Sequence, residues 1–165
     1  MSTQGSETPG QFLNGGEPKE TAGGDTIVFD VADTLRVDGG SGTDTLQFDG
    51  SSQSLNLTAI IGDLYTGFEE IDLTNGNNSL IINEADVLRI TDGLNALADS
   101  AGVSNAANTL IVTGNDLNDS VSVNSSSFTD SGTDVTISGN ICSVYNGDST
   151  DATLLVDNVI SASLA

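Results

Sequence analysis

Apolar and polar residues alternate in short runs through most of this chain, and the runs recur about every ten residues. Three runs near the start share one pattern: a carboxylate, a hydroxyl, apolar residues at the third and fifth positions, and a closing carboxylate. They cover residues 25–30, 33–38 and 44–49. Because successive side chains of a strand point to opposite faces, the two apolar residues share one face. The pattern therefore predicts short strands, each buried on one side.

Looser copies of the pattern continue down the chain, at residues 54–58, 68–74, 78–83, 108–113, 119–124, 134–138 and 152–157. The carboxylates that open the first and third strong copies, Asp25 and Asp44, are 19 residues apart, close to one two-strand coil of a β-roll. We expect these two to stack on one edge while Asp33 faces the other. The sequence predicts an all-β fold, a parallel β-roll or β-solenoid that loses its regularity later in the chain. An antiparallel β-sandwich with Asp-rich turns is the alternative.

Two stretches interrupt the strands. Residues 84–90 follow Asn83, which suits a helix N-cap, and residues 94–101 end before Gly102, which suits a helix stop. We expect a short helical insertion over about residues 84–107, with a bare loop as the alternative. Residues 1–24 hold both prolines and six glycines, a composition typical of a flexible arm or linker. The predicted domain therefore spans residues 25–165.

The formal net charge of −21 comes from 24 acidic residues against three basic ones. Such a chain repels phosphate backbones and anionic lipid, which disfavours nucleic-acid binding and electrostatic docking to membranes. Nor does any stretch approach transmembrane length. A generally acidic, solubilising surface is one explanation of the charge. The other is a set of carboxylates whose repulsion a hard divalent cation relieves. Asp outnumbers Glu by 18 to 6 and lies mostly at strand ends, which favours cation binding.

One segment, residues 39–47 (GGSGTDTLQ), matches the G-G-x-G-x-D-x-U-x nonapeptide of calcium-binding β-rolls. Ca²⁺ takes six to eight oxygens from carboxylates and backbone carbonyls, and a glycine-rich turn can point its carbonyls inward. The alternative is an ordinary turn in which Asp side chains cap backbone amides. The predicted calcium ligands are the carboxylates and glycines that bracket the three strong copies: Asp25, Asp30, Asp33, Asp38, Gly40, Gly42, Asp44 and Asp49.

With this turn and the repeated strands, the chain resembles the repeats-in-toxin (RTX) family, specifically the non-catalytic C-terminal regions of large bacterial calcium-dependent adhesins. The likeness covers most of residues 23–160 and is carried by segments 23–30, 37–46, 55–58, 67–73, 77–80, 85–88 and 152–157. It implies calcium-dependent folding outside the cell and type I secretion through an uncleaved C-terminal signal. The N-terminus lacks the basic and apolar regions of a secretory signal, which agrees with that route. Two departures are the single full nonapeptide and the long connection at residues 94–107.

The leading functional prediction is a secreted, calcium-binding structural subunit that self-assembles into an extracellular fibre, sheet or matrix. We expect a homo-oligomer or polymer, with the arm adding a strand to a neighbouring copy. Gln11, Phe12 and Leu13 form the arm's one apolar anchor. The alternatives are a calcium-dependent adhesin or glycan-binding module, with a cell-surface glycan as partner, and a secretion or capping domain that serves only as a folding nucleus.

Enzymatic function is not expected. The chain has no His, so a Ser/His/Asp or Cys/His arrangement is impossible. Of the neighbouring carboxylates Glu69, Glu70 and Asp72, only the last two share a strand face, and we interpret all three as solvated charges rather than a glycosidase pair. Cys142, the one cysteine, follows an apolar residue and is expected in the core.

Overall fold

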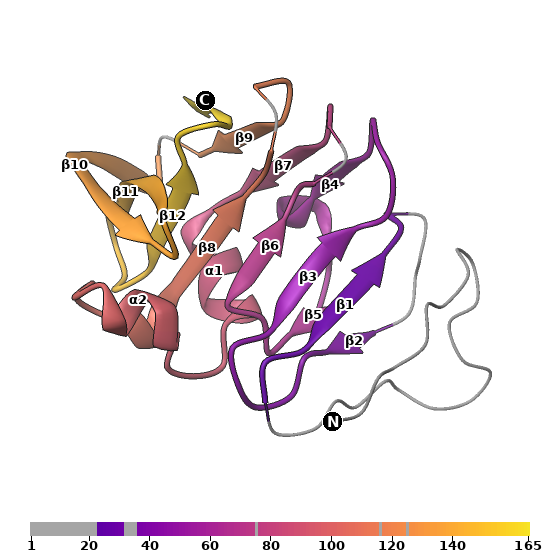
Figure 1. Cartoon of the computed structure of the whole chain (residues 1–165), viewed down its shortest axis with the longest axis horizontal. Coiled ribbons are helices and arrows are strands. Elements are labelled where there is room, and N and C mark those ends of the chain that lie inside the picture. Colours follow the sequence, from indigo (N-terminus) through magenta and orange to yellow (C-terminus); the bar gives the residue numbers. More distant parts are fainter. Residues whose placement is uncertain (1–22, 32–35, 75, 116, 125) are drawn as a thin grey trace.

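The computed structural model describes residues 23–31, 36–74, 76–115, 117–124 and 126–165. These residues form a mostly β structure with two short helices (Figure 1). An all-β fold with a short helical insertion is thus confirmed at the level of its elements. Of the predicted arm, only Gly23 and Gly24 lie within the described residues. Asp33 lies outside them.

Three sheets make up the β structure of the described residues. One has seven strands in the order β1-β3-β6-β8-β12-β11-β10, one has four in the order β13-β9-β7-β4, and β2 pairs with β5. The strands are β1 (Thr26–Phe29), β2 (Val37–Asp38), β3 (Thr45–Phe48), β4 (Ser54–Asn56), β5 (Tyr65–Thr66), β6 (Glu70–Asp72), β7 (Ser79–Ile82), β8 (Thr109–Thr113), β9 (Ser120–Val123), β10 (Phe128–Ile137), β11 (Asn140–Gly147), β12 (Thr153–Asp157) and β13 (Ser161–Leu164).

The chain visits the two larger sheets alternately. Strands β3, β6, β8 and β12 belong to the seven-stranded sheet, and each is followed along the chain by a strand of the four-stranded sheet, namely β4, β7, β9 or β13. All the pairings among these strands are parallel, as are those of β1 with β3 and of β2 with β5. Antiparallel pairing within the described residues is confined to β10, β11 and β12. Each return of the chain therefore adds one strand to each sheet.

The core lies between the sheets and is built from the apolar positions of the repeated pattern. In the seven-stranded sheet, Ile27, Leu46, Ile71, Val112 and Val156 follow one another in register, and all five are buried. The four-stranded sheet contributes Leu55, Leu80 and Val121 in the same way. Each fully buried side chain of this size stabilises the fold by roughly 1.5–3 kcal/mol. Period-two alternation therefore places the apolar residues as the sequence predicts.

The helices interrupt the strands between β7 and β8. Helix α1 (Glu84–Ile90) begins after Asn83, which forms a capping box with Asp86, at the residues that the sequence predicts. Helix α2 (Ala96–Ser100) is shorter than the predicted segment 94–101, because Asn95 caps it by accepting hydrogen bonds from the next turn. Two 3₁₀ turns, η1 (Leu57–Ala59) and η2 (Ala106–Asn108), complete the helical elements. No helix in the described ranges is long and apolar enough to cross a membrane.

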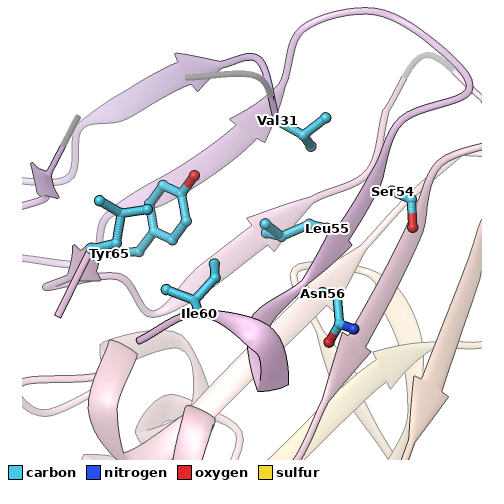
Figure 2. Close-up of a pocket in the computed structure, with 7 residues that line it drawn as sticks. Val31, Ser54, Leu55, Asn56, Ile60 and Tyr65 are labelled. Atoms are coloured by element: carbon cyan, nitrogen blue, oxygen red, sulfur yellow. The ribbon is translucent and has the colours of Figure 1, made fainter. Parts of the chain in front are cut away.

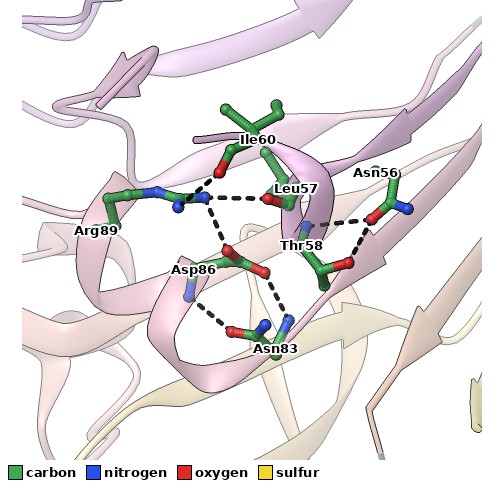
Figure 3. Close-up of polar contacts among 7 residues, drawn as sticks. All are labelled: Asn56, Leu57, Thr58, Ile60, Asn83, Asp86 and Arg89. Carbon is green, nitrogen blue, oxygen red and sulfur yellow. Dashed lines mark hydrogen bonds and ion pairs between the residues drawn. The ribbon is translucent and has the colours of Figure 1, made fainter. Parts of the chain in front are cut away.

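The guanidinium of Arg89 connects helix α1 to the loop after β4. Arg89 donates to a carboxylate oxygen of Asp86 at 2.7 Å and to the backbone carbonyls of Leu57 and Ile60 at 3.2 and 3.3 Å (Figure 3). Helix α2 covers the outer face of the seven-stranded sheet, where Ala98, Ile111, Leu155 and Cys142 form a second, smaller core. Cys142 is fully buried, as expected.

Candidate metal centre

The residues that immediately precede the strands stack into two ladders, one at each end of the strands. The first ladder precedes strands of the seven-stranded sheet and consists of Asp25, Asp44 and Glu69. The second ladder precedes strands of the four-stranded sheet and consists of Gln53, Asn78 and Asp119. Both ladders use the same hydrogen bond between coils, but they are built from different side chains.

In the first ladder the carboxylates of Asp44 and Glu69 each accept the backbone N–H of the preceding rung. The N–H of Asp25 donates to Oδ1 of Asp44 at 2.8 Å, and the N–H of Asp44 donates to Oε2 of Glu69 at 2.9 Å. Asp44 and Glu69 are fully buried. The pairing of β1 with β3 sets Thr26 against Thr45, so Asp25 stacks on Asp44 as the 19-residue spacing predicts.

The glycines of the nonapeptide are required because three turns touch through their backbones. A Cβ on Gly39 would overlap the carbonyl oxygen of Gly67, and a Cβ on Gly42 would overlap that of Gly23. The N–H of Gly39 donates to the carbonyl oxygen of Thr66 at 2.9 Å. The turn at residues 38–44 is therefore packed between the turn at residues 23–25 and the turn at residues 66–69.

This stack of turns collects buried oxygens that lack hydrogen-bond donors. Oδ2 of Asp25 and Oγ1 of Thr66 are buried without a hydrogen-bond partner. Asp38 caps its own turn, since its Oδ1 accepts the N–H of Gly40 at 3.1 Å. Buried acceptors of this kind are costly unless a donor or a cation faces them. An all-oxygen set that includes carboxylates suits a hard cation such as Ca²⁺.

The carboxylates alone do not form a cage. Within the described ranges, no three Asp, Glu, Cys or His side chains come together as a metal-binding group. A cation held in the turn stack would therefore take part of its coordination from backbone carbonyls. Such carbonyls are present, because those of Gly23 and Gly67 face the glycines of the nonapeptide turn.

The interpretation of Glu69 as a solvated charge is wrong. It is fully buried, and burial raises the pKa of its carboxyl from 4.5 to about 7, against the opposing effect of hydrogen bonds from the backbone amides of Asp44 and Asp92. The negative charges of Asp92 and Asp44 raise this pKa further. The reason is positional, since Glu69 precedes β6 as Asp44 precedes β3. Gly67 lies two residues before Glu69, as Gly42 does before Asp44, and this spacing was the signal available in the sequence.

The other two carboxylates of that segment, Glu70 and Asp72, share one face of β6 as predicted, but both are half-buried rather than solvated. Glu70 accepts a hydrogen bond from Oγ1 of Thr113 at 2.7 Å, and Asp72 accepts one from Gln47 at 2.7 Å. Burial raises the pKa of Glu70. Both carboxylates are thus engaged in cross-strand hydrogen bonds.

The predicted calcium ligands fall into two places. Asp25, Asp38, Gly40, Gly42 and Asp44 all belong to the stacked turns of the first ladder. By contrast, Asp30 and Asp49 follow β1 and β3, at the opposite end of these strands. The N–H of Asp49 donates to the carbonyl oxygen of Phe29, and its own carbonyl oxygen accepts a hydrogen bond from the side chain of Gln53. The structure therefore separates these two from the nonapeptide turn, and Asp33 lies outside the described residues.

The second ladder contains two amide side chains and one carboxylate. The N–H of Gln53 donates to Oδ1 of Asn78 at 2.8 Å, and the N–H of Asn78 donates to Oδ1 of Asp119 at 2.9 Å. The side-chain amide of Asn78 also faces the carbonyl oxygens of Gly50, Leu73 and Thr74 at 3.0–3.3 Å. An amide can donate to carbonyls and a carboxylate cannot. At the first ladder the side-chain amide of Asn95 plays a comparable part, because it donates to the carbonyl oxygens of Glu69 and Thr109 at 3.0 and 3.1 Å. The two ladders therefore differ in their carboxylates, which are adjacent only in the first.

A separate apolar cavity of about 290 Å³ lies along β4 (Figure 2). It contains no carboxylate, and its lining consists of Val31, Ser54, Leu55, Asn56, Ile60, Leu64 and Tyr65. The cavity therefore offers none of the oxygen ligands found at the first ladder.

Comparisons of the chain with protein-family models, with curated proteins and with solved structures find no match. The function is accordingly argued from the residues of the site.

Proposed function

We propose that this domain is a short parallel β-solenoid that binds Ca²⁺ at the first ladder. It serves as a secreted structural subunit that assembles with copies of itself into an extracellular fibre, sheet or matrix. The observation that carries the proposal is the stacking of two fully buried carboxylates, Asp44 and Glu69, on adjacent rungs, whereas the second ladder sets its one carboxylate beside the amide of Asn78.

The solenoid architecture is supported by the register of the parallel strands. The rows that run through Leu46 and Leu80 continue across successive coils without a shift. In a solenoid each coil contacts its neighbours only, so inter-coil contacts provide most of the stability. The ladders are such contacts, which makes the charge state of the first ladder a determinant of stability.

Calcium binding is supported by electrostatics. Two buried carboxylates on adjacent rungs repel each other, and a proton or a cation relieves that repulsion. Asp44 and Glu69 are the side chains that would hold the ion, together with carbonyls of the glycine turns. Ca²⁺ would supply positive charge and accept these oxygens in an irregular geometry. Extracellular modules bind Ca²⁺ with dissociation constants of about 10⁻⁴–10⁻³ M, which suits a site that is filled only outside the cell.

A structural role fits the site better than a catalytic one. Both carboxylates are fully buried, whereas the apolar cavity is lined by no carboxylate. The resemblance to the RTX family points to the same role and to secretion by a type I route. We therefore propose a non-enzymatic protein that is released into, or displayed in, a calcium-rich medium.

Thermal melting in Ca²⁺ and in EDTA tests this function. An ion that binds only the folded state stabilises it by about 4 kcal/mol at a thousandfold excess over Kd, so the melting temperature should rise by several degrees. Mg²⁺, which demands a regular octahedral site, should have a much smaller effect. Asp44→Asn is the matched variant, because it removes the negative charge while its Oδ1 still accepts the N–H of Asp25. A melting temperature that is unaffected by Ca²⁺ would eliminate the metal from the proposal.

A further inference from the structure

The C-terminal edge of the four-stranded sheet lacks a neighbouring strand. The seven-stranded sheet continues past β12 with β11 and β10, whereas the four-stranded sheet ends at β13 among the described strands (Figure 1). In register, Ala162 follows the buried Val121, and Leu164 follows the buried Val123. Ala162 and Leu164 therefore continue two rows of the core, yet both are exposed, Leu164 by 44%.

The backbone of β13 is also open on this side. The N–H groups of Ser161 and Ala165 donate toward β9, to the carbonyl oxygens of Asp119 and Val123. Because N–H directions alternate along a strand, those of Ala162 and Leu164 point to the free edge. Unpaired edge groups are a template for another strand.

The surroundings of this edge favour an uncharged, apolar partner. Residues 158–165 contain no charged side chain, although the chain as a whole carries −21. Val159 is 42% exposed and Ile141 is 53% exposed, and a hydrogen bond from the N–H of Asn158 to the carbonyl oxygen of Ile141 keeps them close together. The end strand of the seven-stranded sheet, β10, is protected against pairing with another strand by Asp130, Asp134 and the register shift between them. The edge of β13 has none of these protections.

A second folded copy cannot extend both sheets at this end, because β11 and β10 occupy the position that its seven-stranded sheet would need. An extended segment can lie along β13 without that conflict. Residues 10–16 (GQFLNGG) are such a segment, since they are uncharged and contain the adjacent apolar pair Phe12 and Leu13. They belong to the 22 residues that precede Gly23, which can extend to about 80 Å at most.

We propose that residues 10–16 of a second copy add as a strand along β13, with Phe12 packing beside the small Ala162. This inference rests on the proposed self-assembly and names its interface. The donor segment precedes the first strand and the acceptor edge lies at the last, so each contact leaves a free donor and a free acceptor. A contact of this kind does not close and produces a filament.

Two full-length variants separate donor from acceptor. Phe12→Asp with Leu13→Asp disables the donor segment only. Ala162→Pro removes an outward N–H only, and proline is tolerated on an edge strand whose N–H faces solvent. Ala162→Ser is the matched control, because it retains the N–H. Sedimentation velocity in millimolar Ca²⁺ should show assemblies for the unaltered chain and for Ala162→Ser, and monomers for each disabled variant alone.

Mixing the two disabled variants gives the decisive result. One retains the acceptor and the other the donor, so the mixture should form a 1:1 dimer that grows no further. Assembly of either variant alone, or a mixture that stays monomeric, would overturn the interface. An unaltered chain that is monomeric at all concentrations would overturn it too, including the case in which the segment covers its own β13. Melting in Ca²⁺ and EDTA is measured on every variant, so loss of calcium binding is recognised separately from loss of assembly.

Discussion

The two ladders run through the same coils, one before the strands of each large sheet, and join the coils by the same hydrogen bond with different side chains. In each, a side-chain oxygen accepts a backbone N–H from the coil before it. Asn78 adds a side-chain amide that faces three carbonyl oxygens, while Asp44 and Glu69 add negative charge. The second ladder thus sets one buried carboxylate beside an amide, while the first sets two buried carboxylates on adjacent rungs, and a proton or a cation relieves the repulsion between those two.

The ladders also differ in how closely their turns pack. At the first ladder, backbone lies against backbone at Gly39. At the second, a Cβ on Gly114 would lie 3.0–3.1 Å from side-chain atoms of Ile160 and Asp119, which can move. The nonapeptide turn is thus the more rigid of the two, as suits a site that presents fixed carbonyls.

The largest effect is expected from this difference in packing. Gly39→Ala should lower the free energy of unfolding by about 3 kcal/mol or more, because the new Cβ displaces the carbonyl of Gly67. Gly114→Ala should lower it by about 1 kcal/mol. Urea denaturation measures both. Equal losses would mean that the two turns are equally adaptable.

The pH dependence of the metal-free protein should be nearly as large. The pKa of Glu69 is about 7 in the folded state against 4.5 in the unfolded state, so the folded state binds more protons between these values. Stability is therefore greatest below pH 4.5 with respect to this group and falls as pH rises through 7, by about 3 kcal/mol in all. Urea midpoints in EDTA from pH 5 to pH 8 measure the decrease. Glu69→Gln should flatten the curve, and a curve that is unchanged in this variant would place the titrating group elsewhere.

The next largest loss of stability is expected when a carboxylate replaces the amide in the second ladder. Asn78→Asp removes the amide from three carbonyl oxygens and sets a carboxylate beside Asp119, at a loss of about 2 kcal/mol in EDTA. If the comparison of the ladders is right, Ca²⁺ should restore part of that loss. Melting curves with and without Ca²⁺ measure this recovery. If Ca²⁺ restores none of the lost stability, carboxylates alone do not create a calcium site at the second ladder.

The smallest effect is expected at the end of the second ladder. Oδ2 of Asp119 is buried without a hydrogen-bond partner, while its Oδ1 accepts the N–H of Asn78. Asp119→Asn retains that acceptor and removes the charge, so stability should change by less than about 1 kcal/mol. A large destabilisation, seen as a fall in the urea midpoint, would assign the Asp119 charge a role that the structure does not account for.

Local patterns predicted the strands well because period-two alternation reports which face of a strand is buried. The stacking of Asp25 on Asp44 and the start of α1 after Asn83 also followed from short-range spacing and capping chemistry. The 19-residue spacing did not predict Glu69 as the third rung of the first ladder, because the coils lengthen. Asp25 and Asp44 are 19 residues apart, whereas Asp44 and Glu69 are 25 residues apart. Glu69 was therefore taken for a surface charge.

The hairpin of β10 and β11 was missed for a different reason. Residues 134–138 fit the strand pattern, but the reversal after them is made by Ser138 and Gly139, with φ angles of 52° and 95°. Two consecutive positive φ values are typical of the tight turn between antiparallel strands. The alternating pattern gives no information on whether the next strand runs parallel or antiparallel.

Calorimetric titration of Ca²⁺ into chelator-treated protein tests the central difference between the ladders most directly. At pH 7.5 the unaltered chain and Asp119→Asn should bind Ca²⁺ with the same affinity, while Asp44→Asn should lose binding at least tenfold. Binding that persists in Asp44→Asn, or that disappears in Asp119→Asn, would contradict the assignment of the ion to the first ladder.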